Sequence, residues 1–115
     1  MSRRADPRLA PLVMRAVVDL GGMKQEGYLT NLSASGAFVV VDSLPQVGAE
    51  LSLRAILPWK LGELAARARV IWCSKTEPPI GAGLEFLELE GDSPKLLKAY
   101  LERFVGLAAR LDPES

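Results

Sequence analysis

Residues 50–57 read Glu-Leu-Ser-Leu-Arg-Ala-Ile-Leu, an alternation of apolar and mostly polar side chains. The apolar residues of one face are Leu51, Leu53, Ala55 and Leu57. Successive side chains of a β-strand point to opposite faces, so this period of two predicts a strand with one face in a core and the other in water.

Further short runs of β character lie on both sides of this stretch. With it they give six predicted strands, over residues 12–20, 25–32, 37–41, 50–57, 64–73 and 83–89. Turn residues punctuate the chain between them, at 21–22, 45–48, 58–62 and 78–79. Six strands at this spacing predict an all-β fold, a closed or nearly closed six-stranded antiparallel β-barrel.

The period changes near the C-terminus. Apolar residues then recur at intervals of three and four, at Leu97, Leu101, Phe104, Ala108 and Leu111. This stripe predicts an amphipathic C-terminal α-helix over residues 93–111. Ser93 can cap the free amides at its start, and Pro94 suits the first helical position because its missing N–H is not needed there.

Composition indicates one domain and excludes several function classes. The 115 residues are 49% hydrophobic, enough to bury a core without disulfides or metals. Acidic and basic residues balance at 14 each, so we expect no nucleic acid polymer as partner. There is no histidine and one cysteine, which predicts no metal site, no catalytic residues and no enzyme activity. No apolar run suggests a signal peptide or membrane insertion, and a cytoplasmic location is expected.

The first candidate functional feature is Arg4-Ala5-Asp6-Pro7-Arg8. A guanidinium is a planar fork of donors that suits a phosphate or the O6 and N7 acceptors of guanine. Residues 1–11 are rich in arginine and proline, so we expect a flexible arm, followed by the barrel and helix over residues 12–111. A solvated charged tail is the alternative interpretation.

The second feature is Asn31-Leu32-Ser33-Ala34-Ser35-Gly36, which lies between two predicted strands. Short Asn and Ser side chains can bond to backbone or ligand. Gly36 permits a positive φ or a close approach to a bound group. An ordinary hairpin turn would use the same residue types.

In this order the two features resemble the PilZ domain, with its R-x-x-x-R segment followed by a strand and [D/N]-x-S-x-x-G. The segment Gly83-Leu84-Glu85-Phe86 is also similar to one that the family shows late in its sequence. The resemblance implies a six-stranded barrel followed by a helix, which binds cyclic di-GMP without another cofactor. The implied ligand-binding residues are Arg3, Arg4, Arg8, Asn31, Ser33 and Gly36.

Several consequences follow from the resemblance. Arg3, immediately before the first motif arginine, implies two ligands per chain. Ser35 replaces a frequent glycine, at a loss of backbone freedom if the position needs a positive φ. The absence of an output domain implies an unidentified protein effector. The alternative function is a degenerate PilZ-like adaptor that binds a protein partner without nucleotide.

The two tryptophans and the cysteine receive separate predictions. Trp59 lies in the loop after residue 57, where it either folds back over one end of the barrel or contacts a partner. Trp72 lies in an apolar run and is predicted to be in the core. Cys73, in the same run, is predicted to be a small buried hydrophobe.

Overall fold

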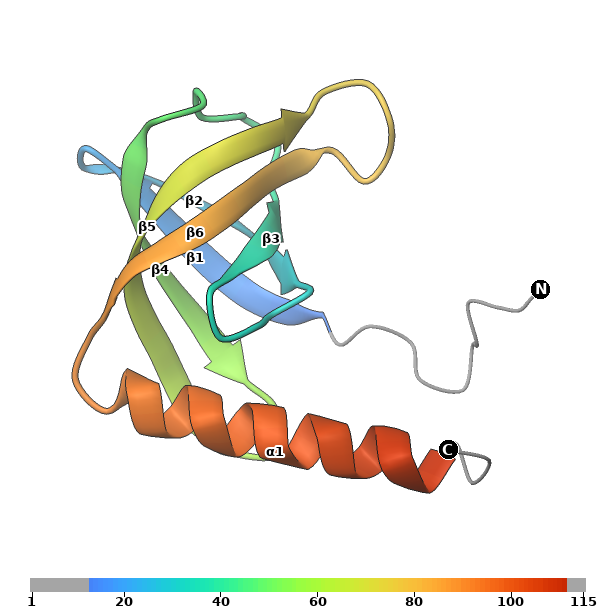
Figure 1. Ribbon diagram of the computed structural model, residues 1–115. Helices are drawn as coiled ribbons and strands as arrows, with labels where there is room; N and C mark the ends of the chain where they lie inside the picture. Colours follow the sequence, from blue (N-terminus) through green and yellow to red (C-terminus); the bar gives the residue numbers. More distant parts are fainter. Residues whose placement is uncertain (1–12, 112–115) are drawn as a thin grey trace.

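The computed structural model describes residues 13–111, with side chains as far as residue 106. Six strands close into a barrel in the order β1-β2-β3-β6-β5-β4, and every neighbouring pair is antiparallel (Figure 1). The elements are β1 (Met14–Leu20), β2 (Met23–Thr30), β3 (Gly36–Val40), β4 (Glu50–Leu57), β5 (Gly62–Ser74), β6 (Gly81–Leu89) and α1 (Ser93–Leu111). The predicted six-stranded antiparallel barrel with a C-terminal helix is confirmed.

Strand boundaries differ from the predictions by up to two residues, and β2 shows why. Gly21 and Gly22 both have positive φ, 61° and 92°, which is the conformation of a two-residue hairpin turn. The next residue, Met23, already pairs with Leu20. The strand therefore begins two residues before the predicted Gln25 and ends at Thr30.

The core combines large aliphatic side chains with alanines. Every second residue of β4 is buried, as its alternation predicts. The largest fully buried side chains are Leu29, Leu53, Leu64, Val39 and Val70. Small buried residues lie among them, namely Ala16, Ala55, Ala66, Ala68 and Ala82. Alternating large and small side chains fill the narrow interior of a small barrel.

Helix α1 lies across one end of the barrel, opposite the β5–β6 loop (Figure 1). Leu97 and Tyr100 are buried against the barrel, and this burial raises the pKa of the Tyr100 phenol. The hydroxyl of Ser93 accepts a hydrogen bond from the Ala65 N–H of β5 at 2.8 Å, instead of the predicted bond to the first amides of its own helix. Ser93 therefore attaches the helix to the barrel. Within the described residues, no helix is both long and apolar enough to cross a membrane.

Trp59 folds back over this end of the barrel. It stacks on Tyr100, with the ring centroids 5.6 Å apart, and the Arg103 guanidinium lies 5.1 Å from the centre of its ring. Trp59 and Lys60 have φ of 60° and 58°, at a cost of about 1–2 kcal/mol per residue. The packing against α1 offsets this cost. Of the two interpretations of Trp59, folding back is confirmed.

Candidate ligand site on the barrel surface

A depression of about 330 Å³ lies on the outer face of β3, β6 and β5. The pairing of the strands determines which residues line it. Gly36 of β3 lies opposite Glu85 of β6. Gly83 of β6 lies between Phe38 of β3 and Trp72 of β5. The loop that carries the predicted motif borders it. The lining residues are Asn31, Ser33, Ser35, Gly36, Ala37, Phe38, Ile71, Trp72, Gly83, Leu84 and Glu85. Three predicted site residues, Asn31, Ser33 and Gly36, are thus brought together.

The prediction that Trp72 belongs to the core is wrong, because β5 contains a bulge. Val70 pairs with Leu84, and Trp72 pairs with Gly83. These partners are two residues apart on β5 but adjacent on β6, so Ile71 is an extra residue without a partner in β6. A bulge shifts the side chains that follow it to the other face of the sheet. Val70 is buried, whereas Ile71 and Trp72 are 50% and 49% exposed.

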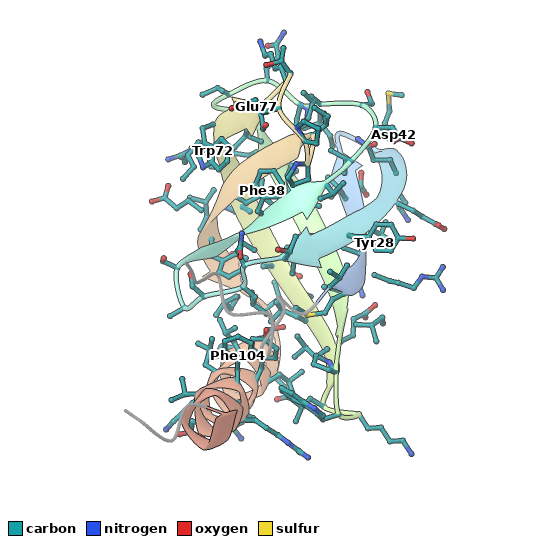
Figure 2. The ribbon with its side chains drawn as sticks, turned by 90° about the vertical axis from the view of Figure 1, so that its right-hand side faces the viewer. Tyr28, Phe38, Asp42, Trp72, Glu77 and Phe104 are labelled. Atoms are coloured by element: carbon teal, nitrogen blue, oxygen red, sulfur yellow. The ribbon has the colours of Figure 1, made fainter. Side chains whose placement is uncertain are left out.

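The indole of Trp72 forms a flat aromatic surface on the barrel. Its Cδ1, Nε1 and Cε2 atoms occupy the space that a Cβ on Gly83 would need. The ring also packs on Phe38, with centroids 5.2 Å apart and planes inclined by 33°. Figure 2 shows the two rings on this face of the barrel. With one side against Gly83 and about half of its surface exposed, Trp72 offers a platform on which a planar group can stack.

The sequence contained one signal for this arrangement, the glycine at position 83. A glycine in a strand interior often marks a site where another group approaches the backbone closely. The approaching group is the Trp72 indole, eleven positions earlier in the chain. Without the register between β5 and β6, the glycine could not be matched to the tryptophan.

Cys73, the residue after Trp72, is half-buried rather than fully buried as predicted. Its thiol donates a hydrogen bond to the Pro45 carbonyl at 3.3 Å.

Hydrogen bonds within the motif loop hold it in shape. The Ser33 Oγ accepts from the N–H groups of Ser35 and Gly36, each at 3.3 Å, and the Ser33 N–H donates to the Gly36 carbonyl at 2.8 Å. Asn31 adopts φ 53°, a left-handed conformation that asparagine tolerates well. Ser33 therefore builds the turn, and the exposed Asn31 side chain is the motif group available at the rim.

Gly36 is required by the barrel itself. Its φ is not positive, and a Cβ at this position would collide with the Leu84 carbonyl oxygen of β6. The predicted close approach is thus to a neighbouring strand, without need of a bound group. Ser35 also lacks a positive φ, so its replacement of a glycine costs no backbone freedom. The Ser35 carbonyl accepts from the Phe86 N–H at 2.8 Å, which ties the loop to β6.

The described wall of the depression contains no lysine or arginine. Nearby cations on the barrel pair with carboxylates, as in Arg69–Glu50 at 3.3 Å and Arg67–Glu88 at 3.9 Å. An anionic ligand would thus need cations from another part of the chain. Arg3, Arg4 and Arg8 lie outside the described residues.

A larger depression of about 810 Å³ lies on another part of the outer surface, formed by β1, β2, β4 and the start of β5. It is lined by both charge signs, and the Arg54 guanidinium in it already donates to Glu63 at 3.0 Å. None of the motif residues contributes to it. We therefore regard the smaller depression, with its open aromatic face and motif loop, as the candidate site.

The sequence is similar to a known protein family. The family model described as PilZ domain matches residues 2–103. Among curated proteins, none matches the sequence at a significant level. No catalytic family is indicated by the matches.

Several solved structures share the fold, among them three that differ in coverage and similarity. The inhibitor of motility MotI/DgrA of Bacillus subtilis has a TM-score of 0.66 at 21% identity over 92% of this chain, which spans only 53% of that protein. The PilZ domain of YcgR from Escherichia coli, solved with c-di-GMP, has a TM-score of 0.55 at 13% identity, with coverage of 99% and 92%. The PilZ domain of CeSA from a cellulose-synthesizing bacterium has a TM-score of 0.53 at 20% identity, with coverage of 86% and 96%.

Proposed function

The chain belongs to the PilZ domain family, and from this premise we propose that it is a receptor for cyclic di-GMP whose site is the depression beside Trp72. The observation that carries the proposal is the open face of the Trp72 indole next to the Asn31 loop. Stacking of a base on an aromatic side chain contributes about 1–3 kcal/mol. A guanine on this platform has Asn31 at the rim as a polar neighbour.

The two phosphates of cyclic di-GMP need cations, and we assign these to Arg3, Arg4 and Arg8 of the arm, residues 1–11. Arg8 is five residues from Val13, so it can reach up to about 17 Å from that residue. The depression lies three strands away from β1, across β2 and β3 to β6. At about 4.8 Å between strands, that path is roughly 14 Å. Arg8 therefore has the reach for the site, and Arg3 and Arg4 have more.

A ligand bound in this way joins the arm to the barrel. We propose that the resulting surface, part arm and part barrel, is what an unidentified protein effector in the cytoplasm recognises. The barrel and helix, residues 12–111, then act as the rigid support of the switch. The Trp59 region is not assigned to the effector, because that side chain is already packed on α1.

Isothermal titration calorimetry with cyclic di-GMP, run beside GTP and cyclic di-AMP, tests the proposal. We expect a dissociation constant in the micromolar range or below for cyclic di-GMP, equivalent to about 8 kcal/mol or more. GTP and cyclic di-AMP should bind much more weakly. Absence of heat and of chemical-shift changes at millimolar cyclic di-GMP would overturn the receptor function and leave the nucleotide-free adaptor.

A further inference from the structure

Glu85 lies on the outer face of β6 beside the aromatic platform. It lines the depression and is exposed to solvent. It is two residues from Gly83, the residue that supports the Trp72 indole, and two residues along a strand are about 6.7 Å apart. The carboxylate is thus beside the platform rather than beneath it. A base stacked on Trp72 would meet Glu85 with its edge.

The described neighbours leave this carboxylate without a cation. Of the ion pairs among residues 13–106, none involves Glu85. Arg69 lies opposite Glu85 in the β5–β6 register, yet its guanidinium donates to Glu50 of β4 at 3.3 Å. The carboxylate of a residue that lines the depression therefore has both acceptor oxygens free of any ion pair with the described residues.

We propose that Glu85 is a specificity-determining residue that recognises the Watson–Crick edge of a guanine stacked on Trp72. This inference rests on the proposed receptor function. The guanine edge presents two adjacent donors, N1–H and the N2 amino group, and a carboxylate can accept both in a bidentate pair. Adenine presents an acceptor at N1, so the same carboxylate disfavours it.

Asn31 cannot supply this recognition on its own. Its amide has one acceptor oxygen, and the other end of the group is a donor, which opposes the guanine donors. Glu85 adds the second acceptor and a negative charge. The division of roles assigns stacking to Trp72 and edge recognition to Glu85, on adjacent strands.

The test compares wild type, Glu85→Gln and Glu88→Gln by calorimetry with cyclic di-GMP and cyclic di-IMP, whose hypoxanthine bases lack the N2 amino group. Glu88 is the matched control because it is exposed on the same strand and pairs with Arg67, away from the depression. Glu85→Gln should weaken cyclic di-GMP binding about tenfold, the lower range for a hydrogen bond to a charged group. Cyclic di-IMP should lose less, so the preference for guanine shrinks.

The outcomes separate the inference from the proposed function. Glu88→Gln should match wild type for both ligands. If Glu85→Gln weakens the binding of both ligands equally, the preference for cyclic di-GMP over cyclic di-IMP is unchanged and the inference is overturned. The carboxylate would then act through its charge alone, for example on an arm arginine. If wild type binds neither ligand, the receptor function itself fails, and the inference fails with it. Melting temperatures of all three proteins establish that the variants are folded.

Discussion

The replacement Gly83→Ala tests the aromatic platform without removing any side chain from the site. The added Cβ would occupy the position of the Trp72 indole atoms, so the ring must move away from β6. No positive φ forbids alanine at position 83, and the half-exposed tryptophan has solvent to move into. The backbone of the strand can therefore remain in place while the flat surface is lost.

The Gly83→Ala replacement should change both the stability of the protein and its affinity for the ligand. The displaced ring loses part of its contact with Phe38, and an aromatic pair of this kind contributes about 0.5–1.5 kcal/mol to stability. A loss of about 1 kcal/mol lowers the melting temperature by several degrees, roughly 4–8 °C for a domain near this size. Loss of base stacking should cost about 1–2 kcal/mol of binding free energy, which is about a fivefold to thirtyfold increase in the dissociation constant.

Calorimetry with cyclic di-GMP measures the second effect, and thermal unfolding followed by circular dichroism measures the first. Gly106→Ala is the matched control, since a Cβ there meets nothing within 4 Å. In a helix this change should stabilise by up to about 1 kcal/mol and leave the affinity unchanged. If Gly83→Ala binds as tightly as wild type, the platform has no part in binding and the site is elsewhere.

Three further predictions concern the arm and the helix. Arg8→Ala should weaken cyclic di-GMP binding by roughly 1.5–3 kcal/mol without lowering the melting temperature of the free protein, and an unfolded variant would show that the arm is structural instead. Trp59→Ala should lower the free energy of unfolding by about 2 kcal/mol in a denaturant titration, because the half-buried ring packs on Tyr100. The affinity for cyclic di-GMP should not change, and a loss of affinity would contradict the placement of the site. Calorimetric titration of wild type should give about two ligands per chain, falling toward one in Arg3→Leu, because a third guanidinium offsets the charge of a paired ligand; a wild-type ratio of one would reject this.

The strands and the helix could be predicted from sequence because their signals are local. The alternation at residues 50–57 and the stripe that includes Leu97 and Leu101 both arise from backbone geometry that repeats along a few residues. The hairpin at Gly21-Gly22 is also a local matter of two glycines with positive φ. These predictions needed no knowledge of which strand lies next to which.

The candidate site was predictable in part. Asn31, Ser33 and Gly36 of the predicted motif all line the depression. The motif did not separate the exposed Asn31 from Ser33, whose hydroxyl is engaged in the turn, or from Gly36, which makes room for Leu84. Hydrogen bonds inside a loop depend on its final shape. Residue types alone therefore identify the loop and leave the roles of its members open.

The features that complete the site come from pairing between distant segments. In sequence, Trp72 lies in the apolar run of residues 70–73, which predicts a place in the core. Ile71 is an extra residue in the pairing of β5 with β6, and it turns Trp72 to the outer face. The extra residue can be recognised only from this pairing, in which Trp72 and Gly83 are more than ten residues apart in sequence. The depression likewise exists only where β3, β6 and β5 are adjacent. Local periodicity thus determines which residues form strands, whereas the side chains that share a surface are set by register, which depends on packing of the whole barrel.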